Sequence, residues 1–281
     1  MMPFIHLGPV AIPTFGIIVA VAMVAAYYVL RADLARRNLA PKDSALAEKL
    51  IAVPCLAGII GARLYHVLET PRDLFGDPIG QLFSRYGLAW FGGLIAGLAT
   101  FLWIARRNKI PLLAILDAGS PAAALGYGIG RIGCLLSGDG DYGVPTSLPW
   151  GMSFPNGLVP TTERVHPTPI YEFIVACAIA WVLWKMGAAQ IATSGPTLAK
   201  GAGMGHPKNQ GFRSQGAVFA AYLVTTGVAR FLVEFIRINP RSFFGMTNAQ
   251  AASVLSVIAG VALWWWVNRR QPHEGRESTP G

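Results

Sequence analysis

Seven stretches of about twenty predominantly apolar residues recur along this 281-residue chain and constrain its fold more than any other feature. About twenty such residues are what an α-helix needs to cross the hydrocarbon core of a bilayer. Hydrophobic residues make up 53% of the chain and charged residues 13%, against roughly 25% charge in soluble domains. The sequence therefore predicts an all-α integral membrane protein with seven transmembrane helices, near 10–30, 49–68, 88–105, 112–136, 169–187, 216–237 and 250–268.

Composition indicates no separate soluble domain, so we expect a single transmembrane domain over residues 1–270. A stretch rich in Gly, Ser, Thr and Lys at about 188–214 is expected to be a flexible cytoplasmic loop. An amphipathic piece at 74–86 is expected at the membrane interface, and residues 271–281 are expected to form a disordered tail.

The basic residues outside the spans are distributed unequally between the two sides of the predicted bundle. Fifteen follow the odd-numbered spans: Arg31, Arg36, Arg37, Lys42, Lys49, Arg106, Arg107, Lys109, Lys185, Lys200, Lys208, Arg213, Arg269, Arg270 and Arg276. Five lie on the other side: Arg72, Arg85, Arg164, Arg237 and Arg241. The positive-inside rule then places the N-terminus outside and the C-terminus in the cytoplasm. Attraction to anionic inner-leaflet lipid accounts for the net charge of +9, and nucleic acid need not be invoked.

Three further arginines, Arg63, Arg131 and Arg230, lie inside apolar stretches. An arginine at membrane depth costs about 2.5–3.5 kcal/mol or more, so it usually faces a cavity and marks a functional site. At 1.5 Å per residue, Arg63 and Arg230 lie roughly 21 Å from the inner ends of their spans, and Arg131 roughly 30 Å from the start of its own. All three fall in the outer half of the membrane. Because guanidinium grips phosphate bidentately, this layer predicts an anionic ligand, most simply a phospholipid.

The glycine-rich segment 126–143 surrounds Arg131 and contains a literal GxGxxG. A dinucleotide site is rejected, because that fingerprint needs a preceding strand and here a membrane helix precedes it. Close helix packing through small residues would explain the glycines. It would not explain Arg131 or the polar Ser137, Asp139 and Asp141 that follow, so we favour a functional role for Arg131.

The sixth span carries Arg230, Glu234 and Arg237 at i, i+4 and i+7, one face of a helix. A purely structural ion pair is one interpretation. The face would keep one uncompensated positive charge, which favours an anion site. The segment His166-Pro-Thr-Pro-Ile-Tyr171-Glu172 leads into the fifth span, and its residues alone leave a structural and a functional role equally open.

Other sequence features suggest structure rather than chemistry. Phe91-Gly92-Gly93 predicts a close approach of two backbones. The three cysteines, Cys55, Cys134 and Cys177, form no CxxC pair or Cys/His cluster, so neither a disulfide framework nor a metal site is expected.

In this order, the segments resemble the prolipoprotein diacylglyceryl transferase family over essentially the whole chain. The resemblance rests on Gly8-Pro-Val-Ala11, Gly61-Ala-Arg63, Gly92-Gly-Leu-Ile95, Gly130-Arg-Ile-Gly133, His166-Pro167 with Tyr171-Glu172, and Arg230-x-x-x-Glu234-x-x-Arg237.

The resemblance implies an enzyme of the bacterial cytoplasmic (inner) membrane with its site toward the outer leaflet. It would move the sn-1,2-diacylglyceryl group of phosphatidylglycerol to the lipobox cysteine thiol of a prolipoprotein and release glycerol-1-phosphate. No cofactor or metal is implied, and the partners would be phosphatidylglycerol, lipobox peptides and membrane lipids. The implied catalytic residues are Arg131, Arg230 and Glu234; the implied substrate-binding residues are Arg131, Arg63, Arg237, Gly143, His166, Tyr171, Glu172 and Asp139.

The chain departs from the family pattern at four positions. Cys134 and Ser137 stand where the family usually has asparagine, Phe91 where it has a histidine, and Phe15 where it has a tyrosine. The base that takes the thiol proton is therefore open among Glu234, the Asp139/Asp141 pair, His166 and positive potential alone. A non-catalytic phospholipid-binding or transport protein on the same scaffold is the alternative function.

Overall fold

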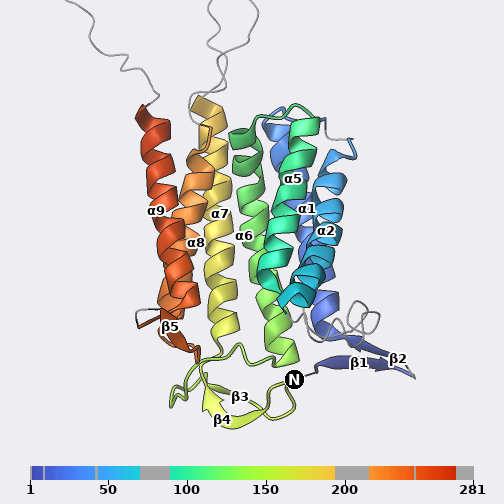
Figure 1. Ribbon diagram of the computed structural model, residues 1–281, viewed down its shortest axis with the longest axis vertical. Coiled ribbons are helices and arrows are strands. Elements are labelled where there is room, and N and C mark those ends of the chain that lie inside the picture. Colours follow the sequence, from blue (N-terminus) through green and yellow to red (C-terminus); the bar gives the residue numbers. More distant parts are fainter. Residues whose placement is uncertain are drawn as a thin grey trace, which may run out of the picture. The chain divides into compact units, whose positions relative to one another are not determined.

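The computed structural model describes residues 2–8, 10–41, 44–69, 89–193, 215–243 and 245–269 (Figure 1). The predicted interfacial piece at 74–86 and the tail at 271–281 lie outside the described residues. Most of the predicted loop at 188–214 lies outside them as well, but residues 188–193 are helical.

Seven helices occupy the described residues, and each overlaps one predicted span. They are α1 (Thr14–Arg36), α2 (Leu46–Glu69), α5 (Trp90–Arg107), α6 (Leu112–Ser137), α7 (Thr168–Thr193), α8 (Ala217–Val233) and α9 (Asn248–Arg269). Five of them, α1, α2, α6, α7 and α9, are long and apolar enough to cross a membrane, while α8 is a shorter apolar helix. The seven predicted helices are thus present, and their length and apolar composition are consistent with a membrane protein.

Three short antiparallel hairpins join or precede the helices and were not predicted. They pair β1 (Phe4–Leu7) with β2 (Val10–Pro13), β3 (Met152–Phe154) with β4 (Thr161–Val165), and β5 (Arg241–Phe243) with β6 (Met246–Thr247). Strands of two to five residues are too short to show a period-2 pattern in the sequence.

The chain forms two compact units. The first unit contains Met1–Val29 and Leu116–Gly281, and the second contains Leu30–Ile115. The prediction of one domain over residues 1–270 stays a prediction.

In the second unit, α2 and α5 pack through glycines. A Cβ atom at Gly92 would lie 2.3 Å from the carbonyl oxygen of Gly61, and one at Gly61 would lie 2.6 Å from that of Gly92. Neither position accepts a side chain without a shift of backbone. The close approach predicted at Phe91-Gly92-Gly93 is confirmed.

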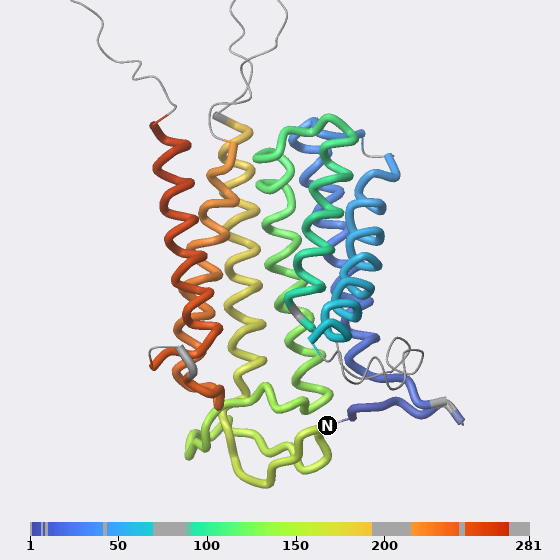
Figure 2. Tube along the Cα trace, in the orientation of Figure 1, coloured from blue at the N-terminus to red at the C-terminus, as the bar shows by residue number. Residues whose placement is uncertain are grey.

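In the first unit, α8 lies beside α7 on one side and α9 on the other (Figure 2). Ala124 of α6, Ala180 and Leu183 of α7 and Val218 of α8 form a buried apolar cluster. Small residues bring α8 close to α9, since a Cβ at Gly260 would lie 2.8 Å from the carbonyl oxygen of Ala220. This packing holds α6, α7 and α8 together, the three helices that supply the candidate site.

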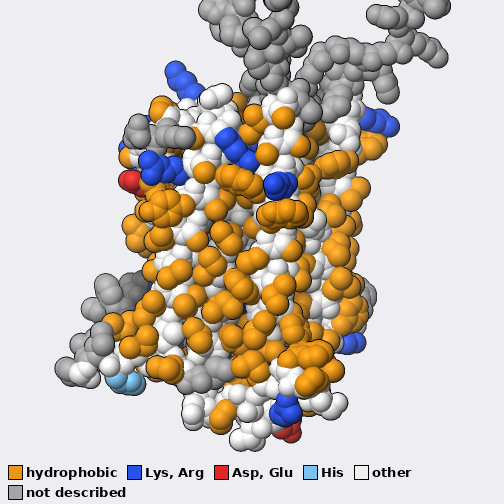
Figure 3. Space-filling model, turned by 180° about the vertical axis from the view of Figure 1, so that it is seen from behind, with side chains coloured by type: hydrophobic (Ala, Val, Ile, Leu, Met, Phe, Trp, Pro, Cys, Tyr) orange, Lys and Arg blue, Asp and Glu red, His pale blue; other side chains and the backbone are white. Residues whose placement is uncertain are grey.

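The outward flanks of the helices are apolar. Figure 3 shows hydrophobic side chains over the helix sides, with Lys and Arg gathered near the helix ends. Large exposed hydrophobic residues occur on most of the helices, among them Leu56, Leu98, Trp181, Leu232 and Leu255. Such surfaces suit contact with lipid hydrocarbon rather than water.

Helix α8 ends earlier than the predicted span 216–237. Glu234 is its C-terminal cap, and Arg237 forms an isolated antiparallel bridge with Gly143. The amide of Val144 donates to the carbonyl of Ile236 at 2.8 Å. The backbone after Val233 thus pairs with the segment that follows α6, and this pairing competes with continued helix.

Candidate functional site

The candidate site lies at one end of the helices of the first unit. Arg131 lies near the C-terminus of α6, Glu172 in the first turns of α7, and Arg230 near the C-terminus of α8. These ends lie at the same side, where the chain also carries β3 and β4 (Figure 1). The antiparallel course of successive helices therefore brings residues far apart in sequence into one cluster.

Glu172 is the centre of this cluster. Its carboxylate accepts hydrogen bonds from the Tyr127 hydroxyl at 2.6 Å and from Arg230 Nη1 at 2.9 Å. Arg131 Nε lies 3.1 Å from Glu172 Oε2, and Arg237 Nη1 lies 3.4 Å from the same oxygen. Three guanidinium groups from two helices and the segment after α8 thus converge on one carboxylate that is only 5% exposed.

Asp141 forms a second link between the arginines. It follows α6 and pairs through one carboxylate oxygen with Arg131 and through the other with Arg237. Its backbone carbonyl accepts the Thr168 hydroxyl at 2.5 Å. Burial alone would disfavour the charged carboxylate, but the positive charges of Arg131 and Arg237 prevail and hold the pKa of Asp141 below its usual value.

Glu234 completes the cluster from the end of α8. The predicted pair with Arg230 is present, with Arg230 Nη2 3.0 Å from Glu234 Oε2. Arg237 Nε lies 3.8 Å from the same oxygen, and the Asn239 amide donates to the other. Glu234 has no exposed side-chain surface.

The predicted uncompensated positive charge is not found in this cluster. Arg131, Arg230 and Arg237 are matched by three carboxylates, those of Asp141, Glu172 and Glu234. The prediction considered one helix face, whereas Asp141 and Glu172 come from other segments. A buried network of this kind fixes orientation more than it adds stability, because desolvation offsets much of the Coulomb attraction.

Gly143 and His166 meet through their backbones beside the cluster. The Gly143 amide donates to the His166 carbonyl at 2.8 Å, and the His166 amide donates to the Val144 carbonyl at 3.1 Å. A Cβ at Gly143 would lie 2.5 Å from the Ile236 carbonyl oxygen and 2.9 Å from the His166 Cβ. Only glycine fits where these three segments cross.

The His166 side chain belongs to a polar chain with Tyr171 and Trp150. Trp150 Nε1 donates to the Tyr171 oxygen at 2.8 Å, and that oxygen lies 3.3 Å from His166 Nδ1. The Tyr171 oxygen has a second lone pair, so the Tyr171 hydroxyl can donate to Nδ1 or accept from it, according to the His166 tautomer.

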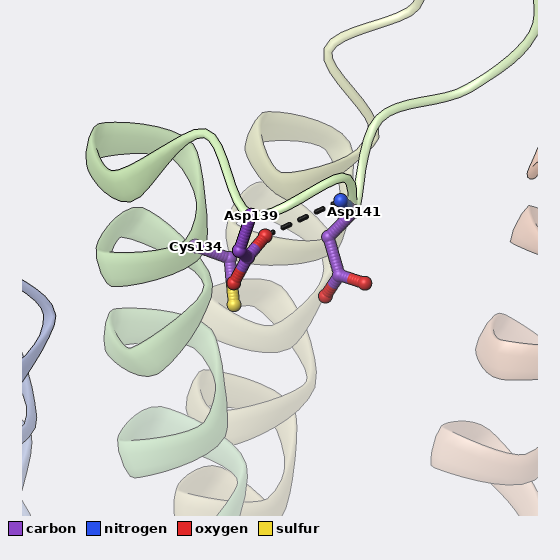
Figure 4. Close-up of side chains that lie close together, drawn as sticks. All are labelled: Cys134, Asp139 and Asp141. Atoms are coloured by element: carbon purple, nitrogen blue, oxygen red, sulfur yellow. Dashed lines mark hydrogen bonds between the residues drawn. The ribbon is translucent and has the colours of Figure 1, made fainter. Parts of the chain in front are cut away.

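Cys134, in the last turn of α6, and Asp139, which follows that helix, lie close together (Figure 4). Arg131 Nη1 is 3.6 Å from the Cys134 sulfur, and the Asp141 amide donates to Asp139 Oδ1 at 3.2 Å. Burial of the Asp139 carboxyl, together with the negative charge of Asp141, raises its pKa above the usual value.

Cys134, Asp139 and Asp141 have ligand atoms within 4.8 Å of one another, the one such group of three found among the described residues. Both carboxylate oxygens of Asp141 are already engaged by guanidinium groups. Two neighbouring positive charges disfavour a metal cation there, so this donor set is poorly suited to a metal.

Of the ten predicted site residues, the cluster contains Arg131, Arg230, Glu234, Arg237 and Glu172, with Gly143, His166, Tyr171 and Asp139 around it. Arg63 is a buried residue of α2 in the second unit, and its part in binding stays a prediction.

Tyr127 and Thr168 were missed by sequence reasoning. Tyr127 precedes Arg131 by four residues and shares its helix face, a spacing that marks it as a neighbour. Its hydroxyl also lies 3.1 Å from Arg131 Nε. Nothing in the sequence marks Thr168, because its partner is a backbone carbonyl 27 residues away.

The chain is similar to known proteins over most of its length. The family model described as prolipoprotein diacylglyceryl transferase matches residues 3–266. Curated relatives named phosphatidylglycerol–prolipoprotein diacylglyceryl transferase include one from Paracidovorax citrulli, 29% identical over 286 residues and covering 95% of both chains. Another, numbered 2 in its name, is from Streptomyces coelicolor and is 32% identical over 92% of this chain and 76% of its own. The match spans all the segments that build the site, and the chain belongs to the prolipoprotein diacylglyceryl transferase family.

Proposed function

We propose that this chain transfers the sn-1,2-diacylglyceryl group of phosphatidylglycerol to the lipobox cysteine of prolipoproteins and releases glycerol-1-phosphate. The observation that carries the proposal is the convergence of Arg131, Arg230 and Arg237 on Glu172. Guanidinium groups held in fixed planes suit a phosphate whose negative charge grows as its ester bond breaks. The names of the curated relatives support both substrates.

All seven helices cross the cytoplasmic membrane in this proposal, with the N-terminus outside. The excess of basic residues after the odd-numbered spans supports this orientation. The C-terminal ends of α6 and α8 then lie at the outer leaflet. There they reach phosphatidylglycerol in the membrane and the exported cysteine from the water side.

Each member of the cluster has a distinct task in the reaction. Arg131 and Arg230 bind the phosphate through the N–H groups that their carboxylate partners leave available, since each guanidinium has five. Glu172 and Glu234 hold those guanidiniums in orientation, so little reorganisation is needed during reaction. Asp141 is 28% exposed and is the most exposed of the three carboxylates. It is therefore the one that an incoming phosphate displaces from the arginines most readily.

The reaction is a displacement at carbon. The cysteine thiolate attacks the carbon of the diacylglyceryl group that bears the phosphate oxygen. A C–S bond forms, and the C–O bond breaks with its electron pair on oxygen. The leaving group is a phosphate monoester with one more negative charge than the diester. Arginine stabilises that charge, and no step requires a metal or cofactor.

A reconstitution experiment tests the proposal. Purified protein is mixed with phosphatidylglycerol vesicles and a lipobox peptide, and mass spectrometry detects the thioether-linked diacylglyceryl peptide. A matched peptide with serine in place of cysteine should give no product. Saturable lipid binding without product would instead establish the phospholipid-binding alternative, which the departures at Phe91 and Cys134 keep open.

A further inference from the structure

One carboxylate at the site differs from the others in its partners. Among the described residues, Asp141, Glu172 and Glu234 each form ion pairs with two or more arginines. Asp139 forms none, and its recorded hydrogen bonds join it to the Asp141 amide and the Cys134 side chain. A carboxylate whose charge is neutralised by guanidinium is a poor proton acceptor, so Asp139 is the available base of the four.

The position of Asp139 is set by backbone contacts on both sides of it. Gly138 and Gly140 have positive φ angles of 59° and 92°, which favour glycine. The Leu158 amide donates to the Ser137 carbonyl at 3.0 Å, and the Val159 amide donates to the Gly138 carbonyl at 2.8 Å. The turn that carries Asp139 is therefore held to the segment before β4.

Asp139 also lies beside two side chains that contact Arg131, the arginine proposed to bind the phosphate. Its carboxylate lies close to the Cys134 sulfur and the Asp141 carboxylate (Figure 4), within 4.8 Å of each. Both of these groups contact Arg131. A phosphate bound to Arg131 would place the adjoining glycerol carbon, and so the attacking sulfur, close to Asp139. Burial and the charge of Asp141 raise the pKa of Asp139, which makes it a stronger base than an ordinary aspartate.

His166 is less suited to this role. The hydrogen bond of its side chain is to the Tyr171 hydroxyl, which also accepts from Trp150. Among the described residues, the His166 side chain has no hydrogen bond with Arg131, whereas Cys134 and Asp141, the neighbours of Asp139, both contact that arginine.

We propose that Asp139 accepts the proton of the lipobox cysteine thiol. This inference rests on the proposed function. In the step, the S–H bond breaks, the proton moves to the Asp139 carboxylate, and the sulfur electron pair forms the C–S bond as the C–O bond breaks. The carboxylic acid then returns its proton to water or to the released glycerol phosphate.

The test compares Asp139→Asn, Asp139→Glu and a matched control, Glu163→Gln, which neutralises an exposed carboxylate on β4. The assay uses phosphatidylglycerol vesicles and a lipobox peptide between pH 6 and 9.5. Loss of a general base lowers kcat/KM by roughly 10²–10⁴-fold near neutral pH. A free thiol has a pKa near 8.5, so hydroxide can ionise it at high pH and the deficit of Asp139→Asn should shrink there.

A selenocysteine peptide provides the sharper measurement, because its selenol is already ionised at neutral pH. Wild type and Asp139→Asn should transfer to this peptide at similar rates. Asp139→Glu should keep part of the activity and the wild-type response to pH. In wild type and Asp139→Glu, activity should fall as the pH drops and the carboxylate becomes protonated.

The outcomes separate the two proposals. A deficit in Asp139→Asn that is equal at every pH and with both peptides would show a structural role and overturn the inference, as would full activity at pH 7. Absence of product from the wild-type chain with either peptide would overturn the proposed function itself.

Discussion

Glu172 shows at the scale of single residues how the site depends on charge balance. It is nearly buried and faces Arg131, Arg230 and Arg237, so its negative charge is needed to keep these three guanidinium groups buried. An amide of the same shape would keep some hydrogen bonds but not the charge. The cost of removing it is the cost of leaving buried cations uncompensated.

We expect Glu172→Gln to lower stability by about 3–5 kcal/mol, the usual effect of removing one partner from a buried ion pair. Thermal unfolding in detergent micelles measures it, with Glu163→Gln as the exposed control. An unchanged unfolding temperature for Glu172→Gln would show that the arginines find other partners and that Glu172 does not organise the cluster.

Arg131→Ala and Arg230→Ala should abolish transfer of the diacylglyceryl group while membrane insertion persists. Lysine at either position should restore little, because an ammonium cannot reproduce the planar fork of guanidinium. Product formation is measured by mass spectrometry, with Arg241→Ala, an exposed residue of β5, as control. Near-normal transfer by either alanine variant would remove that arginine from the phosphate site.

At the scale of elements, apolar windows predicted the seven helices well because membrane-length helices leave a long, repeated signal. They failed at the end of α8, where Phe235 and Ile236 continue the apolar pattern although the helix ends at Val233. The cause is pairing of Ile236 with Val144, 92 residues earlier in the chain, which no local window can detect. Sequence also left Asp139 and Asp141 equivalent, because only their contacts with arginine distinguish them.

The glycines between α2 and α5 make a prediction for one helix pair. Gly92→Ala should destabilise the protein by about 1–3 kcal/mol, the usual range for overpacking, because its Cβ would lie 2.3 Å from the Gly61 carbonyl oxygen. Gly16→Ala in α1 is the matched control, since nothing lies within 4 Å of its added Cβ. Equal unfolding temperatures for the two variants would contradict tight backbone packing.

At the scale of the whole molecule, the unequal distribution of basic residues predicts which side each loop faces. The segment between α6 and α7, with β3 and β4, should face the outside, where exported substrates present their cysteine. This segment also carries Asp139 and His166, so the accessibility of the reaction depends on the same assignment.

A cysteine in place of Asn156, an exposed residue between β3 and β4, tests this orientation. It should react with a membrane-impermeant thiol reagent in intact cells, after the outer membrane is permeabilised if one is present. The wild-type chain, with Cys55, Cys134 and Cys177, is the control for background labelling. Reaction only after the inner membrane is disrupted would invert the proposed topology.

A buried carboxylate far from the reaction has a consequence for how accurately the site is assembled. Asp117 of α6 accepts the amides of Gly216 and Phe219 at 2.8 Å, and the Gln190 amide of α7 donates to it at 3.0 Å. Arg230 lies eleven residues beyond Phe219 along α8, roughly 16 Å away at 1.5 Å per residue. Asp117 thus fixes the position of α8 along its own axis. A shift of α8 by one residue along that axis would move the Arg230 backbone by about 1.5 Å and break both amide contacts.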